Sequence, residues 1–209
     1  LKLIIYFINK EGYLFMKKRI WLLFLSLFCL TACTTFETTE KTTEENTISD
    51  TETASQQEGT VYNKSFGTYT VANGWIESET FSTEDKFFYI AETDQQQTRP
   101  NNISINMGSN FYSLDDHVSF RKAILNQLAA QLPQDVVLNG SGSYTDNDYV
   151  LYTFTFTITD KENSLIATQY YIVGDYKYIM VYESVYDESN KEETDMVAKT
   201  IVDTFLWAE

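Results

Sequence analysis

The sequence predicts an α+β fold, an antiparallel sheet packed with two main helices in a sandwich. Three observations support this prediction. Short segments between residues 66 and 185 alternate apolar and polar residues, which is typical of strands in a sheet. Two other segments repeat apolar residues every three or four positions, which is typical of amphipathic helices. One helical segment interrupts the series of strands and the other follows it, and this order favours the α+β class.

The predicted strands are separated by turn signals. They are expected at 66–72, 86–91, 102–107, 136–143, 149–159, 165–173 and 176–185. The clearest is 149–159, in which the even positions from Val150 to Ile158 are apolar and the odd positions are mostly threonine. Asn73-Gly74 predicts a turn after the first strand, and Gly174-Asp175 predicts a short hairpin between the last two. The sheet is therefore expected to be antiparallel.

Two helices are predicted from their spacing and end signals. The first begins at Ser113 with a pattern that resembles a capping box, and Pro133 ends it. Its apolar stripe is expected to run through Leu114, Val118, Leu125, Leu128 and Leu132, interrupted by Arg121. The second begins near Ser189-Asn190, where acidic residues suit the positive end of the helix dipole. Its inner face is expected to hold Val197, Ile201, Phe205 and Ala208.

The N-terminal part carries the features of an exported lipoprotein. Three cations follow Met16, and the apolar run Ile20–Leu30 is shorter than the roughly 20 residues that span a bilayer. Leu30-Thr31-Ala32-Cys33 resembles the bacterial lipobox. The resemblance implies a covalent diacylglycerol on Cys33, which becomes the mature N-terminus and anchors the chain to the cell membrane on its extracytoplasmic face. The alternative is an ordinary secreted protein with a cysteine at this position. No other cofactor is expected.

Three regions are predicted. Residues 1–32 are an upstream extension plus the signal peptide. Met16 is a better start site than Leu1, so residues 1–15 are upstream translated sequence, the result of a start codon assigned too early, or an extended N-terminal part of the signal peptide. Residues 33–60 are the lipidated cysteine and a Thr/Glu-rich tether, which has too few apolar residues to fold and is expected to be disordered. Residues 61–209 form one globular domain. The long tether favours a Gram-positive-type envelope.

Charge and cysteine content narrow the possible partners. The chain has 15 basic and 30 acidic residues, a formal charge of −15. Residues 1–32 hold five basic and one acidic residue, so the mature part carries −19. This charge disfavours nucleic acid and anionic lipid as partners. No cysteine follows Cys33, so an exported domain forms no internal disulfide. The expected partners are the membrane, through the lipid anchor, and an envelope protein or a wall polymer.

Three stretches carry a pattern found in one known fold. Tyr69–Trp75 is a strand that ends in a Gly-Trp turn, with Ala72 where proline is usual. Asn102–Met107 leads into the long helix, and Ala198–Ala208 closes the chain. Over roughly Gly67–Glu209 the chain resembles the fold shared by the photosystem protein PsbP, the Ran-binding protein Mog1 and the bacterial lipoprotein DcrB. The resemblance implies little about activity, because known members mostly bind proteins and lack a shared catalytic motif.

The sequence shows no catalytic or metal-binding constellation. His117 is the only histidine, so any triad or metal–histidine scheme must use it. Asn139–Ser143 lacks the Gly-x-Ser-x-Gly spacing of a nucleophile elbow. Asp146-Asn147-Asp148 lacks the spaced ligands of a calcium loop and is better explained as a hairpin turn. We therefore expect neither a catalytic residue nor a metal ligand.

Tyrosines supply the candidate binding residues. Many of them crowd the last four strands, and most are expected to pack in the sheet. If both helices cover one face, the other face would present tyrosine and threonine to solvent. The candidates are Tyr152, Tyr170, Tyr171, Tyr178 and Tyr182. The sequence thus favours a non-enzymatic binding or accessory lipoprotein of the cell envelope. One alternative is a small envelope hydrolase or transferase; another is that the excised signal fragment acts as a secreted peptide signal.

Overall fold

The computed structural model describes residues 58–144, 149–160 and 163–208. The predicted signal peptide, Cys33 and nearly all of the tether lie outside these residues, as does Asp146-Asn147-Asp148. The first strand begins at Gly59, two residues ahead of the predicted domain boundary at Val61. In the part of the chain that the structure describes, no helix has both the length and the apolar character needed to cross a bilayer.

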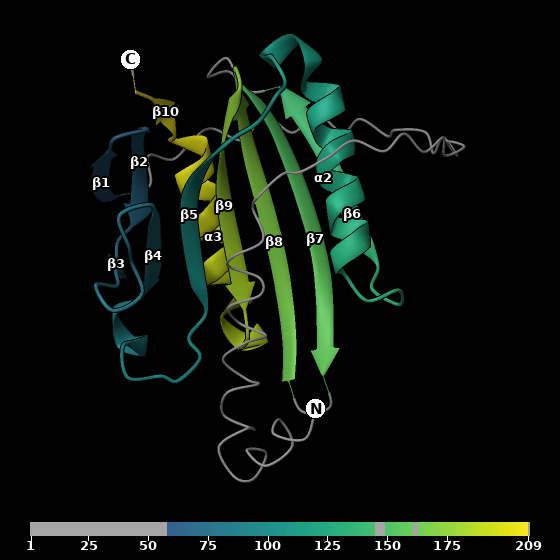
Figure 1. Cartoon of the computed structure of the whole chain (residues 1–209). Helices are drawn as coiled ribbons and strands as arrows, with labels where there is room; N and C mark the ends of the chain where they lie inside the picture. Colours follow the sequence, from purple (N-terminus) through teal and green to yellow (C-terminus); the bar gives the residue numbers. More distant parts are fainter. Residues whose placement is uncertain (1–57, 145–148, 161–162, 209) are drawn as a thin grey trace, which may run out of the picture. The chain divides into compact units, whose positions relative to one another are not determined.

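Seven strands form one antiparallel sheet in the order β3-β4-β5-β9-β8-β7-β6 (Figure 1). Their bounds are Trp75–Glu77 (β3), Lys86–Ala91 (β4), Asn102–Ser109 (β5), Leu138–Tyr144 (β6), Val150–Asp160 (β7), Asn163–Gly174 (β8) and Lys177–Val185 (β9). The long hairpin of β7 and β8 pairs Val150 with Val173 and Asp160 with Asn163. A second sheet in the order β1-β2-β10 contains Gly59–Lys64 (β1), Gly67–Ala72 (β2) and Leu206–Trp207 (β10).

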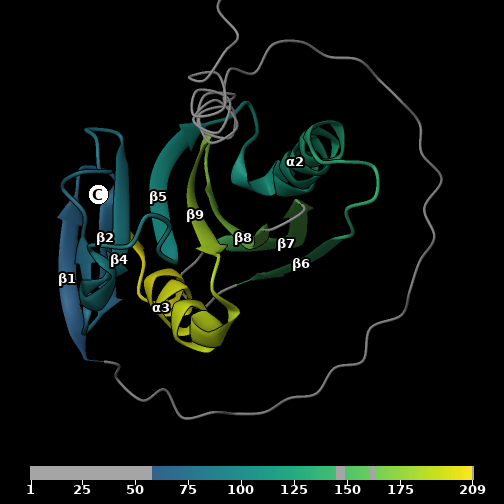
Figure 2. The same ribbon diagram turned by 90° about the horizontal axis from the view of Figure 1, so that it is seen from below.

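The two helices lie on opposite faces of the seven-stranded sheet (Figure 2). Helix α2 (His117–Gln131) follows a short 3₁₀ turn, Leu114–Asp116, and packs on one face. Helix α3 (Lys191–Asp203) lies on the other face, over β9, β5 and the neighbouring strand β2. The predicted α+β fold class with an antiparallel sheet and two main helices is therefore confirmed. The predicted tyrosine surface required both helices to lie on one face of the sheet, and they do not.

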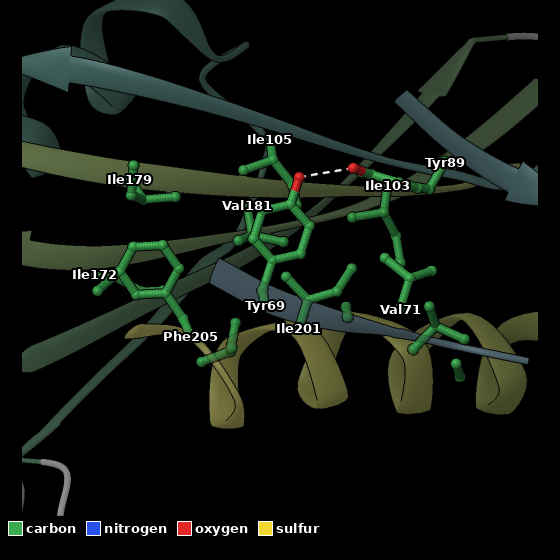
Figure 3. Packing of buried hydrophobic residues seen from close by; sticks show 14 of the residues in the cluster. Tyr69, Val71, Tyr89, Ile103, Ile105, Ile172, Ile179, Val181, Ile201 and Phe205 are labelled. Atoms are coloured by element: carbon green, nitrogen blue, oxygen red, sulfur yellow. Dashed lines mark hydrogen bonds between the residues drawn. The ribbon is translucent and has the colours of Figure 1, made fainter. Parts of the chain in front are cut away.

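The larger core cluster lies between α3, the small sheet and the α3 side of the large sheet (Figure 3). Tyr69 and Val71 of β2 face the isoleucines of β5, and Ile201 and Phe205 close the cluster from the α3 side. The hydroxyls of Tyr69 and Tyr89 share a hydrogen bond of 2.6 Å. A smaller cluster on the opposite face holds Phe120, Ile124 and Leu128 of α2 against Tyr152, Phe154, Phe156, Ala167, Tyr171, Val173, Tyr178 and Met180.

Both helices differ in detail from their predictions. Helix α2 buries Phe120, Ile124 and Leu128, whereas the predicted stripe residue Val118 is 61% exposed. Positions 120, 124 and 128 repeat every four residues without a charged interruption, and this row is the one that packs on the sheet. Helix α3 ends at Asp203, so Phe205 packs in the core from beyond the helix and Ala208 is exposed.

Candidate functional site

The predicted tyrosine surface is absent from the described part of the chain. Tyr152, Tyr171 and Tyr178 are each at most 5% exposed and pack under α2, and Tyr182 is half-buried beside them. Tyr170 points to the opposite face, where it is half-buried against the α3-side core. Burial raises the pKa of the Tyr171 and Tyr178 hydroxyls, so both rings stay neutral. Helix α2 covers this face of the sheet, so these tyrosine side chains pack against the helix instead of facing solvent.

A different surface is open to solvent on the α3 side of β6 and β7. We call it the hydroxyl face and define it by Ser141, Ser143, Thr153, Thr155 and Thr157. The serines and Thr157 are exposed, and the other two threonines are half-buried. Ser141 pairs with Thr153 across the two strands, and the Thr155 hydroxyl bonds to that of Thr168 on β8 at 3.3 Å. The threonine positions of this face follow the alternation that the sequence predicts for 149–159.

The hydroxyl face is bordered by an open sheet edge. Among the described residues β6 pairs only with β7, so the other side of its backbone offers unpaired N–H and C=O groups. Edge strands are usually protected by charge, proline or short length. The opposite edge, β3, has three residues, whereas β6 has seven, Leu-Asn-Gly-Ser-Gly-Ser-Tyr, without a charge or a proline. The β6 edge can therefore accept a further strand.

Among the carboxyl groups of the described residues, Glu183 has the most strongly raised pKa, and it lies at the inner end of the same cross-strand row. Thr155, Thr168 and Glu183 are direct neighbours on β7, β8 and β9. The Glu183 side chain is 1% exposed, and its Oε2 accepts a hydrogen bond of 3.3 Å from the Tyr170 hydroxyl. Its Oε1 accepts no hydrogen bond from any described residue. Burial first, and then the hydrogen bond and negative charge of Asp195, raise the pKa of Glu183 to about 8.

The sequence analysis did not identify Glu183, although a signal was present. In the strand 177–185 the odd positions Ile179, Val181 and Val185 are apolar, and Glu183 is also at an odd position, so it lies on the same face of the strand. A glutamate at a position that faces the core indicates a protonated or paired carboxyl. In the structure Glu183 is 1% exposed beneath α3, and burial and the neighbouring Asp195 raise the pKa of its carboxyl.

The other candidates of the sequence analysis have local partners. His117 accepts or donates a hydrogen bond at Nδ1 with the Tyr152 hydroxyl, 2.6 Å away. Residues 139–143 form the middle of β6 and no turn. Glu193, one of the acidic residues at the start of α3, accepts a bond of 3.0 Å from Trp75 Nε1. Within residues 58–144, 149–160 and 163–208, no three His, Cys, Asp or Glu side chains are arranged to hold a metal ion.

The comparisons with known proteins support a fold and no activity. No protein-family model matches the sequence, and no curated protein is similar to it. Among solved structures, the chain is similar to LpqN of Mycobacterium tuberculosis, described as involved in cell envelope biogenesis, with a TM-score of 0.51 and 10% identity over 74% of this chain and 87% of that one.

Two further structures match with lower scores. Cyanobacterial PsbP from Synechocystis is 15% identical over 71% of this chain and 92% of that one, with a TM-score of 0.43. The Ran-binding protein Mog1p of Saccharomyces cerevisiae is 10% identical over 71% of this chain and 95% of that one, with a TM-score of 0.46. The predicted likeness to PsbP and Mog1 is thus found among the solved structures as a likeness of fold, and fold alone assigns no function.

Proposed function

We propose that this chain is a surface-anchored, non-enzymatic lipoprotein that acts as a binding module in the cell envelope. The observation that carries the proposal is the uncharged β6 edge beside the hydroxyl face. We propose that it accepts an extended segment of an envelope protein as an additional strand. In this mode, main-chain hydrogen bonds supply affinity and alternate side chains supply specificity. The hydroxyls of Ser141 and Thr153 would line one side of the added strand.

Two observations support the envelope setting. Leu30-Thr31-Ala32-Cys33 follows a charged and apolar leader, as in bacterial lipoproteins. LpqN, which shares the fold, is described as involved in cell envelope biogenesis. Two acyl chains on Cys33 would hold the chain at a membrane, since stable anchoring takes more than one chain.

The alternative, a small envelope hydrolase or transferase, has one observation in its favour. Glu183 has the raised pKa expected of a general acid. A general acid must contact its substrate, however, and this carboxyl is 1% exposed beneath α3. We therefore favour binding over catalysis. Turnover of an envelope-derived substrate that is lost in Glu183→Gln or His117→Ala would contradict this choice.

A capture experiment with matched variants tests the β6 edge. The chain is used to capture proteins from an envelope extract at low and high salt. Ser141→Lys places a charge on the β6 edge, in the way that natural edges are protected. Val61→Lys is the control, because Val61 is 61% exposed on β1, an edge strand of the small sheet. We expect Ser141→Lys to lose a partner that wild type and Val61→Lys retain.

The possible outcomes separate the edge from the acidic charge. A partner retained by both variants but lost at high salt would indicate that the net charge binds it, and the edge would be excluded. The anchor is tested separately with Cys33→Ala, which we expect to move the chain from the membrane fraction to the medium. Full retention of Cys33→Ala in the membrane fraction would contradict the anchor.

A further inference from the structure

Two carboxyl groups and one cation lie close together where the first half of α3 covers β9. Glu183 on β9 lies beneath the helix, and Asp195 on α3 is about half exposed above it. Lys191 forms an ion pair with Asp195 one helical turn away, on the solvent side. Tyr170 on β8 also contacts Glu183, and the pKa of its hydroxyl is raised by burial and then by the negative charges of Glu183, Asp195 and Asp203. On β5, the residue paired with Glu183 is the apolar Ile103.

Both oxygens of the Glu183 carboxyl have hydrogen-bond partners only when this carboxyl carries a proton. A protonated carboxyl can donate to the Asp195 carboxylate while Oε2 accepts the bond from Tyr170. A hydrogen bond from the protonated Glu183 to Asp195 would join the sheet to the first half of α3. Loss of the proton would leave Glu183 and Asp195 as neighbouring negative charges, with Lys191 as the nearby cation. A buried carboxylate with one hydrogen-bond donor and a like charge beside it is unfavourable, so ionisation favours a movement of the helix that admits water.

We propose that Glu183 and Asp195 form a proton-dependent latch that holds α3 against the sheet and releases it when Glu183 ionises. The latch goes beyond the proposed binding function and does not depend on it. Glu183 lies in the same cross-strand row as Thr155 and Thr168, next to the hydroxyl face. Release of α3 would therefore enlarge the open surface beside β7.

The sign of the pH effect follows from the direction of the shift. The folded state holds a proton on Glu183 that an opened state, with an ordinary glutamate value of 4.5, has released. Opening of α3 therefore becomes more favourable as pH rises from about 4.5 towards 8. One proton released on opening changes the opening equilibrium by up to roughly tenfold per pH unit. Above this range the effect reaches a plateau.

Amide hydrogen exchange of the full chain between pH 6 and pH 9 tests the latch. After correction for the intrinsic pH dependence of exchange, we expect protection of residues 191–203 to fall up to about tenfold per pH unit below pH 8. Protection of residues 117–131 in α2 should change much less. Constant protection of α3, or equal losses in both helices, would overturn the proposal.

Variants assign the effect to Glu183. Glu183→Gln keeps a donor towards Asp195 at every pH, so α3 protection should become independent of pH. Glu192→Gln makes the same chemical change at an exposed position of α3 and should behave as wild type. A pH response retained by Glu183→Gln would exclude this carboxyl. If Glu183→Gln fails to fold, Asp195→Asn removes the like charge and should weaken the response and shift it to lower pH, and an unchanged response would contradict the latch.

Discussion

Asn101 joins the loop before β5 to the segment that leads into α3, and its loss should be costly. The side chain is 4% exposed and makes four hydrogen bonds. Its Oδ1 accepts from the backbone N–H groups of Tyr186 and Asp187 at 2.8 and 2.9 Å. Its Nδ2 donates to the Asp187 carbonyl at 2.9 Å and to the Thr194 hydroxyl at 3.2 Å. Asn101→Ala would remove all four bonds at once.

The expected cost follows from the number of bonds and their burial. A typical hydrogen bond contributes about 0.5–1.5 kcal/mol net, and a buried group left unpaired costs about 1–3 kcal/mol. Water can reach part of this segment, so we expect Asn101→Ala to lower the free energy of unfolding by about 3 kcal/mol. Thr194→Val is the comparison. It removes one of the four bonds and the bond of 2.8 Å from the Thr194 hydroxyl to the Asn190 carbonyl, and it should cost about 1–2 kcal/mol.

Urea unfolding at constant m-value measures both effects. In a domain of this size, 3 kcal/mol corresponds to a decrease in melting temperature of roughly 6–12 °C. The reasoning would be refuted if Asn101→Ala differed from wild type by less than about 0.5 kcal/mol, the usual range of a surface substitution. A cost no larger than that of Thr194→Val would also refute it, because the backbone bonds would then contribute nothing.

Two further predictions concern packing. Gly108→Ala should lower the free energy of unfolding by about 1–3 kcal/mol, because a Cβ there would lie 2.2 Å from Cζ of the buried Tyr178 ring. In a double-mutant cycle, most of this cost should disappear when Tyr178 is replaced by valine. A cost that persists in Tyr178→Val would contradict the clash. Tyr149→Phe should lower the free energy of unfolding, measured by thermal unfolding, by about 1 kcal/mol, because it removes a hydrogen bond to the Val202 carbonyl at the end of α3. A neutral result would contradict this prediction and would mean that water replaces the bond.

The strands with regular alternation could be predicted closely from the sequence. The segment 149–159 is observed as Val150–Asp160, and 86–91 is observed with the same bounds. β3 and β10 were missed because strands of three and two residues are too short to show a period. β1 was missed because its residues are mostly exposed and follow directly on a polar segment. Pairing in register, and not composition, makes these segments strands.

The helix faces show what an amphipathic pattern can and cannot decide. In α3 the predicted Val197 and Ile201 are buried, since few apolar residues compete for the stripe. In α2 apolar residues occur on several sides, and the stripe chosen for its leucines contained Arg121. The row of Phe120, Ile124 and Leu128, which is the one that is buried, would have been the better choice, because a charged residue rarely lies in the centre of a buried face.

The placement of the tyrosines depended on which faces the helices cover. β9 contains the continuous apolar run Tyr178–Tyr182, which indicates a strand buried on both faces. That signal argues against two helices on one side, and the structure has one on each. The tyrosines on the α2 side therefore pack in the core. The sequence could have predicted this from the run, but it could not assign each helix to a side.

The location of the open surface follows from the dimensions of the covering elements. A helix is about 10 Å wide and strands are about 4.8 Å apart, so one helix covers roughly two strands. On the α3 side, α3 and the three-stranded sheet cover the half of the large sheet that contains β9 and β5. Strands β6 and β7 lie beyond that reach, which is why their serines and threonines stay at the surface. Recognition is therefore expected where coverage ends, beside the β6 edge, and the latch at Glu183 lies at the border of that uncovered region.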